Sequence, residues 1–264
     1  MPVFTISRGA YSYGREVAEK LARKLNYECI SREIILSASR LFNIPEMMLI
    51  RAVHDAPSVF DRFSYGKQRY VAYVRQAILE MVQKDNVVYH GLAGHYFLRG
   101  IPHVIKVRIL AGMEDRVAEE MRREYVSAEE ARRNLIKDDE ARDAWSQYIV
   151  GINTSDPSLY DIVLNVRYLA IDEAVDIIAG AAHLPCFQPT VESRKTMYRL
   201  LIAARLQVAL MDEIPSIKVD VENDKIVVVA KGYWAKGKDL LAKINRLLDS
   251  EKEQVRIEMK LSNK

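Results

Sequence analysis

The sequence predicts an α/β fold, a three-layer parallel sheet with helices on both faces, followed by a small αββαβ domain. Short β-prone runs alternate with helical stretches over residues 3–182, as in sheets built from strand–helix–strand units. The first of these runs opens directly into a glycine-containing loop and then a helix. Two prolines in residues 184–189 interrupt the pattern, and a second set of periodic segments follows them.

Apolar spacing predicts the elements of the first part. A β-prone run at residues 3–6 leads into the loop, and apolar residues at helical spacing follow at 17–25. Residues 30–84 predict several helices, broken near Pro45 and Pro57. The charged residues 114–147 predict a pair of solvated helices. The remaining predicted elements are strands at 86–89, 103–110 and 161–165, and helices at 113–124 and up to about residue 182.

The C-terminal stretch has periodic patterns of its own. Residues 194–211 predict a helix, and two alternating runs joined at Asn223-Asp224 predict a hairpin. A further amphipathic helix and an alternating strand complete the αββαβ order. The predicted division of the chain is a domain over residues 1–183, a linker over 184–193 and a domain over 194–264.

Composition excludes several classes of protein. The 264 residues are about half apolar and carry a net charge of only +3, so a nucleic-acid partner is not expected. Two cysteines without a CxxC spacing exclude a disulfide framework or a zinc cluster as the organising feature. The first residues lack signal-peptide features, and the most apolar helix is interrupted by Arg199 and Arg205. We therefore expect no transmembrane segment and a cytoplasmic location.

The loop after the first strand has the glycine spacing of a Walker A motif, Gly9-x-x-x-x-Gly14. Backbone N–H groups of such a loop, with the start of the next helix, attract phosphate. Arg15-Glu16 stand where Lys-Ser/Thr is usual. Arginine binds phosphate oxygens bidentately, whereas a carboxylate replaces the magnesium-ligating hydroxyl only through water. The pattern alone favours a tight strand-to-helix turn as much as a phosphate site.

Five segments in order resemble the cytidylate-kinase-like family, whose members have a P-loop NTPase fold of the monophosphate kinase type. The resemblance covers about residues 3–182 and implies ATP and Mg²⁺ as cofactors. It also implies phosphoryl transfer to a nucleoside monophosphate (CMP/dCMP-like) or a similar small acceptor. The segments are Thr5–Arg8, Ser12–Ala18, Ser31–Ile35, Lys137–Arg142 and Tyr160–Asn165.

The resemblance assigns candidate roles to individual residues. Arg15, with the lid cations Lys137 and Arg142, would act in catalysis, and Arg40 and Asp161 would bind the acceptor. The donor phosphates would lie against Gly9, Ser12, Tyr13, Gly14, Arg15, Glu16 and Arg116. No set of metal ligands stands out.

Structural roles explain several of these residues equally well. Asp161 could cap a turn at the start of a strand, and most lid arginines have acidic partners at helical spacing. Arg51 is an alternative to Arg40 for the acceptor phosphate. Tyr13, Glu16 and Leu92 depart from the family pattern, and they motivate an alternative function. In that alternative, the chain is a nucleotide-binding regulator with little or no turnover that acts through its C-terminal module.

The C-terminal module resembles a BON-type domain in its order of elements. Such modules look like binding or assembly elements. Tyr233 and Trp234 lie beside Lys231, Lys236 and Lys238, a combination that suits an anionic or protein ligand. Core packing with lysines extended toward water explains the same residues.

Overall fold

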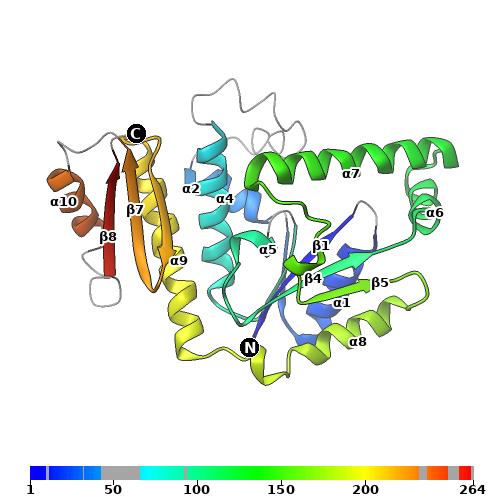
Figure 1. Ribbon diagram of the computed structural model, residues 1–264. Coiled ribbons are helices and arrows are strands. Elements are labelled where there is room, and N and C mark those ends of the chain that lie inside the picture. Colours follow the sequence, from blue (N-terminus) through cyan, green and yellow to red (C-terminus); the bar gives the residue numbers. More distant parts are fainter. Residues whose placement is uncertain are drawn as a thin grey trace.

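A five-stranded parallel sheet forms the centre of the N-terminal part in the computed structural model of the protein (Figure 1). The structure describes residues 1–9, 12–31, 33–42, 66–91, 94–231, 237–248 and 256–262. The strand order is β2-β3-β1-β4-β5, and every neighbouring pair is parallel. The strands are β1 (Val3–Arg8), β2 (Glu28–Ile30), β3 (Val87–His90), β4 (Val104–Leu110) and β5 (Ile162–Asn165).

Helices cover both faces of this sheet because its central strands alternate between two cores. Phe4 and Ile6 of β1 pack with α1 (Gly14–Leu25) and α8 (Ile171–Ala181) on one face. Val3 packs on the other face with apolar residues of several helices. These helices include α2 (Glu33–Phe42), α4 (Gly66–Val82), α5 (Gly94–Phe97), α7 (Ala128–Val150) and α9 (Val191–Met211). The result is the predicted three-layer arrangement.

The structure corrects the sequence prediction at two points. The short strand β2 was not predicted, because only Ile30 of its three residues is fully buried and its pairing with β3 is a tertiary contact. The pair α6 (Met113–Glu124) and α7 is not wholly solvated, since α7 buries Leu135 and Trp145. The predicted breaks near Pro45 and Pro57 lie outside the described residues.

A second, three-stranded sheet forms the C-terminal part. Strand β7 (Lys225–Lys231) pairs antiparallel with β6 (Lys218–Glu222) and parallel with β8 (Arg256–Ser262). Asn223 and Asp224 adopt positive φ values of 47° and 62° in the hairpin turn, as two-residue turns of this kind require. Helices α9 and α10 (Gly237–Leu247) pack against the apolar side of the sheet. The αββαβ order is as predicted.

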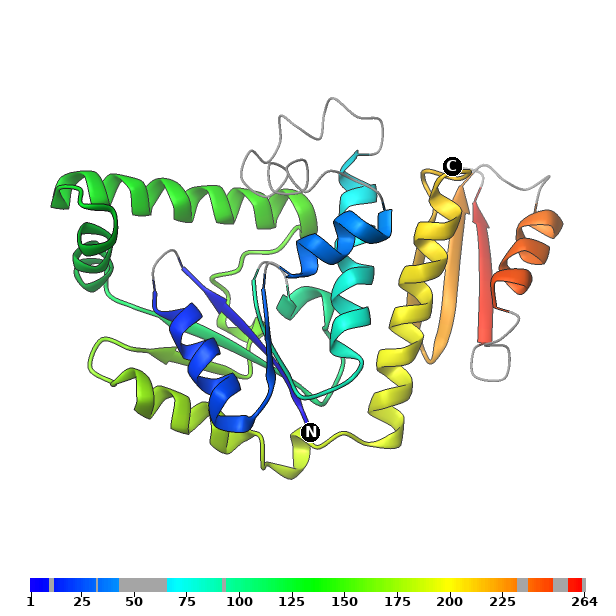
Figure 2. The same cartoon turned by 180° about the vertical axis from the view of Figure 1, so that it is seen from behind.

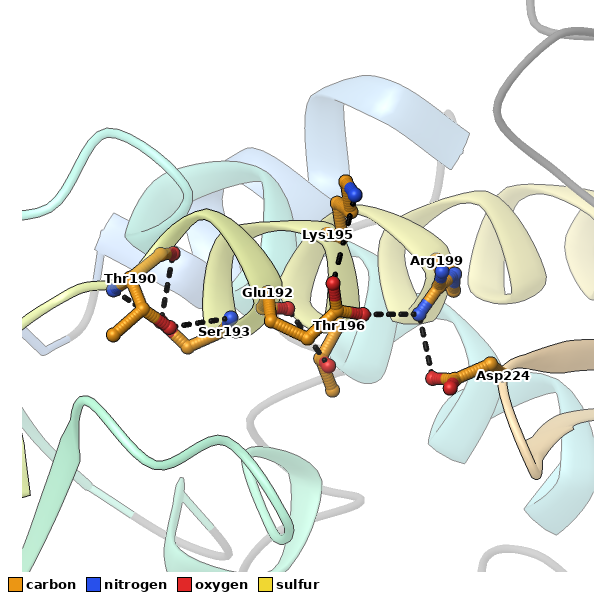
Figure 3. A network of polar contacts seen from close by, with 7 residues as sticks. All are labelled: Thr190, Glu192, Ser193, Lys195, Thr196, Arg199 and Asp224. Carbon is orange, nitrogen blue, oxygen red and sulfur yellow. Dashed lines mark hydrogen bonds and ion pairs between the residues drawn. The ribbon is translucent and has the colours of Figure 1, made fainter.

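Helix α9 is buried from two sides. It begins at Val191, inside the predicted linker, where Thr190 and Ser193 form reciprocal hydrogen bonds between side chain and backbone N–H (Figure 3). Leu201 faces the core shared with α4, whereas Ile202 faces the core of the C-terminal sheet. Figure 2 shows α9 between α4 and the second sheet.

Ion pairs reinforce the position of α9. Arg199 Nη1 lies 2.6 Å from Asp224 Oδ1 in the hairpin turn and 3.3 Å from Glu192 Oε1 (Figure 3). Arg75 of α4 lies 2.9 Å from Asp220 Oδ1 of β6. These contacts join α4, α9 and the hairpin. Within the described ranges, no helix has both the length and the apolar character needed to cross a membrane.

The buried carboxylate of Asp85 ties the first turn of α9 to the loop before β3. Its oxygens lie 2.6 Å from Arg194 Nη2, 3.5 Å from His103 Nε2 and 3.8 Å from the Met1 amino group. Asp85 is 7% exposed, so the positive charges of Arg194 and the Met1 amino group compensate a carboxylate that is removed from water. Burial lowers the pKa of His103, so this ring adds no such charge at pH 7.

We expect Leu201→Ala to lower the free energy of unfolding by about 2–5 kcal/mol, because Leu201 is 1% exposed and its truncation leaves a cavity beside α4. Urea unfolding measures the change. Val191→Ala, at a 73% exposed position of the same helix, is the control and should change stability by no more than about 0.5 kcal/mol. Equal effects of the two substitutions would contradict the burial of α9 against α4.

Candidate active site

The chain passes from β1 into α1 through a loop that requires glycine at its end. A Cβ at Gly14 would lie 2.7 Å from Cβ and 2.8 Å from Cδ of Arg8. Tyr13 precedes it in the left-handed conformation, with φ 59° and ψ 2°. A close approach between strand end and helix start therefore explains Gly14 before any ligand is considered. Ala10 and Tyr11 lie outside the described residues.

Ser12 ties this loop to the sheet. Its hydroxyl is buried within hydrogen-bonding distance of two carbonyl oxygens, Gly9 O at 3.1 Å and Ile109 O at 3.2 Å. A hydroxyl has one proton to donate, so these carbonyls share it. The Ser12 side chain thus points into the protein, and its backbone N–H is the group left for a phosphate.

Tyr13 fills the space between the loop and α6. Its hydroxyl donates to Asp115 O at 3.5 Å. Burial raises the pKa of Tyr13, with smaller contributions from the carboxylates of Glu119 and Asp115. A large side chain therefore stands where a small residue would let the backbone approach a phosphate more freely.

The predicted cation Arg15 lies on the exposed side of the first turn of α1. Its Nε is 2.7 Å from Glu19 Oε1, and this hydrogen bond lowers the pKa of Glu19. Glu16 lies on the same helix 3.5 Å from Lys20 Nζ. Exposed pairs of this kind contribute about 0–1 kcal/mol, so Arg15 can exchange Glu19 for another anion at little cost.

Arg116 of α6 and Asp139 of α7 meet beside the loop. Arg116 Nη2 is 2.7 Å from Asp139 Oδ2, and Arg116 is 8% exposed. A Cβ on Gly9 would lie 3.5 Å from Asp139 Oδ1 and 3.8 Å from Arg116 Cζ. The two helices lie beyond the carboxyl ends of β1 and β4 in both views (Figures 1 and 2). The charged pair therefore closes over the loop at Gly9.

The other predicted cations are divided by the structure. Arg142 is half-buried one helical turn after Asp139, on the side of α7 that also buries Leu135 and Trp145. Lys137 is exposed, as is Arg40 in the last turn of α2. Among the described residues, neither Arg142 nor Lys137 makes an ion pair or a side-chain hydrogen bond. The structure thus brings Arg142, but not Lys137, to the inner side of α7.

Asp161 stands at the amino end of β5, held by β4. Its Oδ2 accepts the Lys106 N–H at 2.7 Å and lies 2.9 Å from Lys106 Nζ. Its own N–H donates to Lys106 O at 2.8 Å. These contacts account for Asp161 as an anchor of the edge strand, and contact with an acceptor stays a prediction.

A polar cluster next to the loop was missed by the sequence prediction. Arg108 of β4 donates through Nη1 to Thr154 O and, at 3.2 Å, to the Tyr160 hydroxyl, and its Cζ lies 5.5 Å from the centre of the Tyr160 ring. The Tyr160 hydroxyl is 3.2 Å from Ser7 Oγ, and the His95 ring is 5.1 Å from the Tyr160 ring. The available signal was a charged residue inside a central, otherwise apolar strand.

Two buried histidines flank this end of the sheet. Burial, with the nearby Arg8, lowers the pKa of His90 to about 4. Burial, with Arg108 and Lys106, lowers the pKa of His95 to about 4. Both are therefore neutral at pH 7. His90 Nδ1 and His95 Nε2 have no hydrogen-bond partner among the described residues.

Lowering the pH from 6.5 toward 4 is expected to destabilise the protein. In this window the unfolded chain protonates both histidines, with an ordinary pKa of 6.5, while the folded chain keeps them neutral. The free energy of unfolding then falls by up to about 1.4 kcal/mol per pH unit for each histidine. Urea unfolding at several pH values measures this slope. It should become shallower in His95→Gln and stay unchanged in the control His183→Gln, whose side chain is exposed; an unaltered slope in both would refute the assignment.

Comparison with known proteins agrees with this fold. The model of the cytidylate kinase-like family matches residues 3–168. An uncharacterised protein from Eubacterium ventriosum has a similar structure, with a TM-score of 0.53 and 21% identity over 69% of this chain and 97% of that one. The shikimate kinase of Bacteroides thetaiotaomicron aligns with a TM-score of 0.43 and 12% identity, over 69% of this chain and 99% of the kinase.

A search of curated proteins found no match. The family match covers more than half of the chain and includes the loop, helices α6 and α7 and all five strands of the large sheet. The large sheet and its helices are thus a P-loop kinase fold, which supports ATP-dependent phosphoryl transfer in general. The chain belongs to the cytidylate kinase-like family.

Proposed function

We propose that this protein transfers the terminal phosphoryl group of ATP to a nucleoside monophosphate, of the CMP or dCMP type, or to a similar small acceptor. The observation that carries the proposal is the placement of Arg116 directly over the loop at Gly9. Phosphoryl transfer requires mainly positioning and cations around the transferred group, and a buried arginine at a phosphate-type loop supplies both.

The donor phosphates would lie along the loop between Gly9 and Gly14. Among the described residues that are not its chain neighbours, Asp139 Oδ1 comes nearest to the position of a Cβ on Gly9, at 3.5 Å, so a phosphate oxygen that replaced this carboxylate could approach the backbone there. The start of α1 adds about 0.3–1 kcal/mol for each interacting charge. Arg116 and the exposed Arg15 would supply the remaining positive charge, and Arg142 lies on the inner side of the lid helix α7.

Most of the ligands of a magnesium ion at this site would be phosphate oxygens and waters, with few from the protein. Mg²⁺ usually binds one or two carboxylates, substrate phosphates and several waters. Glu16, in the first turn of α1, and Asp139, beside Gly9, are the carboxylates in position to hold it. When bound, the ion neutralises charge on the transferred phosphoryl group.

The Arg116–Asp139 ion pair lies where the donor phosphates would bind. A carboxylate that bonds a guanidinium presents the same kind of anionic oxygen as a phosphate. Binding of the donor would therefore replace Asp139 as the partner of Arg116. Asp139 is only one-third exposed, so the exchange also requires α7 to shift or the aspartate to find a cation or magnesium.

The first experiment measures ADP formation from ATP and magnesium against a panel of nucleoside monophosphates. We expect turnover with one acceptor. We also expect Arg15→Ala to weaken ATP binding in calorimetry by about tenfold or more, because a charge-assisted hydrogen bond is lost. Arg23→Ala, at an exposed position in the last turn of α1, is the matched control. Unchanged ATP binding in Arg15→Ala would refute its role in the phosphate site.

The alternative function is a nucleotide-responsive regulator without turnover. Tyr13 favours it, because its side chain fills the space between the loop and α6. The effect of nucleotide binding would reach the C-terminal part through α4 and α9, which pack in one core. ATP binding without product supports this alternative, and hydrogen exchange in residues 194–231 that does not respond to ATP would exclude it.

Asp139→Asn distinguishes the effect of this carboxylate on ATP affinity from its effect on the free energy of unfolding. Removing the carboxylate leaves the buried Arg116 without this partner, so the free energy of unfolding should fall by about 1–3 kcal/mol. ATP affinity should rise severalfold, because the donor phosphates no longer displace Asp139. Calorimetry and urea unfolding measure the two effects. Glu129→Gln, in the exposed pair with Arg133, should change neither; weaker ATP binding in Asp139→Asn would instead assign the carboxylate to magnesium.

We propose residues 194–264 as a BON-like binding module for a protein or an anionic ligand. The observed αββαβ order supports the proposal. The candidate patch of Tyr233, Trp234 and Lys236 lies outside the described residues, as do the side chains of Lys231 and Lys238.

A further inference from the structure

Arg108 carries a charge that no carboxylate of the described residues neutralises. Its side chain is half-buried on the face of β4 opposite the apolar residues Val107 and Ile109. Its contacts in the described part of the chain are a carbonyl oxygen, a phenolic hydroxyl and the face of a tyrosine ring. Lys106, two residues earlier on the same face, pairs with Asp161. Arg108 has no carboxylate within ion-pair distance among the described residues, and a cation that is partly removed from water without a counter-ion attracts an anion.

The groups around Arg108 form a polar site in which some buried atoms have no hydrogen-bond partner among the described residues. His95 is 5% exposed, lies against the Tyr160 ring and has no partner for its Nε2 among the described residues. The buried Thr5 Oγ1 on the same side of β1 also lacks a partner there. Buried polar atoms are otherwise nearly always hydrogen-bonded. A neutral imidazole and two hydroxyls beside a guanidinium can hold both an anionic group and an adjoining hydroxyl.

The site lies next to the loop. Ser7 Oγ contacts the Tyr160 hydroxyl at 3.2 Å, and Ser7 pairs with Arg108 in the sheet. Ser7 precedes Gly9 by two residues in an extended strand, a span of about 7 Å. A small molecule held by Arg108 would therefore present a phosphate oxygen or a hydroxyl within reach of a phosphoryl group on the loop.

We propose that Arg108, with Tyr160, Ser7 and His95, binds the anionic group of the phosphoryl acceptor. This inference rests on the proposed function and narrows the acceptor to a small compound that carries either a phosphate, whose own oxygen receives the phosphoryl group, or a carboxylate beside an accepting hydroxyl. The Thr154 carbonyl, which accepts from Arg108 and from the Tyr160 hydroxyl at 2.9 Å, stands in for one anionic oxygen in this structure. Segment 151–156 would release these donors when the acceptor binds.

The test titrates the full-length protein with inorganic phosphate and follows the His95 ring in proton–carbon NMR spectra, with His95→Gln to assign the signal. We expect a saturable shift whose dissociation constant rises about tenfold or more in Arg108→Gln, and by less in Arg108→Lys, which keeps the charge. Arg167→Gln is the matched control, because Arg167 also lies over a tyrosine ring, 5.1 Å from that of the exposed Tyr168. A His95 signal that does not respond to phosphate, or responds equally in Arg108→Gln, overturns the proposal. If Arg108→Gln does not fold, an affinity in Arg108→Lys equal to that of the unaltered protein has the same meaning.

Arg116→Gln distinguishes phosphate bound at the loop from phosphate bound at Arg108. This substitution should leave the response of His95 to phosphate intact. The NMR readout needs neither ATP nor turnover, so a saturable response in a protein that forms no ADP would refute the transferase and support the anion site. Turnover with an unchanged KM for the acceptor in Arg108→Gln would support the transferase and refute the anion site. The two sources of the anion are compared by displacement of phosphate with CMP and with glycerate; the compound that acts at the lower concentration identifies the acceptor class.

Discussion

The candidate site depends on one close approach, that of Arg8 at the end of β1 to Gly14 at the start of α1. With 2.7 Å between Arg8 Cβ and the position of a Cβ on Gly14, the strand must pass almost directly into the helix. Ser12, just before this helix start, therefore lies against the sheet, where its hydroxyl reaches Ile109 O of β4. This fixes Gly9 next to Arg116 and Ser7 next to Tyr160. The same turn thus positions both the proposed donor side and the proposed acceptor side.

Two arginines at this edge of the sheet differ in how their charge is balanced. Arg116 has a carboxylate partner, so an incoming anion competes with Asp139 for it. Arg108 has neutral partners among the described residues, so an incoming anion meets no such competitor. If both bind anions, the acceptor side is ready first, and the donor side becomes available only when the lid pair separates. The order of binding would then follow from the charge balance.

Local patterns predicted most of the fold. The helix at residues 113–124 and the strand–loop–helix unit at Gly14 follow from apolar spacing and glycine position, which depend on short segments of chain. Strand β2 escaped prediction because it exists through pairing with β3, almost sixty residues away in sequence. The placement of Arg116 beside Gly9 was suggested by resemblance. The Arg108 cluster was not, since Ser7, His95 and Tyr160 are brought together only by the folded sheet. For Asp161 the sequence left a backbone role and an acceptor role open, because a carboxylate at a strand start satisfies a backbone as readily as a ligand; the structure shows its bond to the β4 backbone, and contact with an acceptor stays a prediction.

Helix α9 has a consequence for how the two parts of the chain can diverge. One side of it, with Met197 and Leu201, completes the core of the large sheet, and the other side, with Ile202 and Leu206, completes the core of the small one. A C-terminal module from another protein would have to bring a helix that matches α4 as well as its own sheet. Natural recombination at residues 184–189 is thus constrained by the contact between α9, which follows this segment, and α4. Substitutions in α4 and α9 are expected to covary, and neither part of the chain can be replaced without changing the helix that contacts the other.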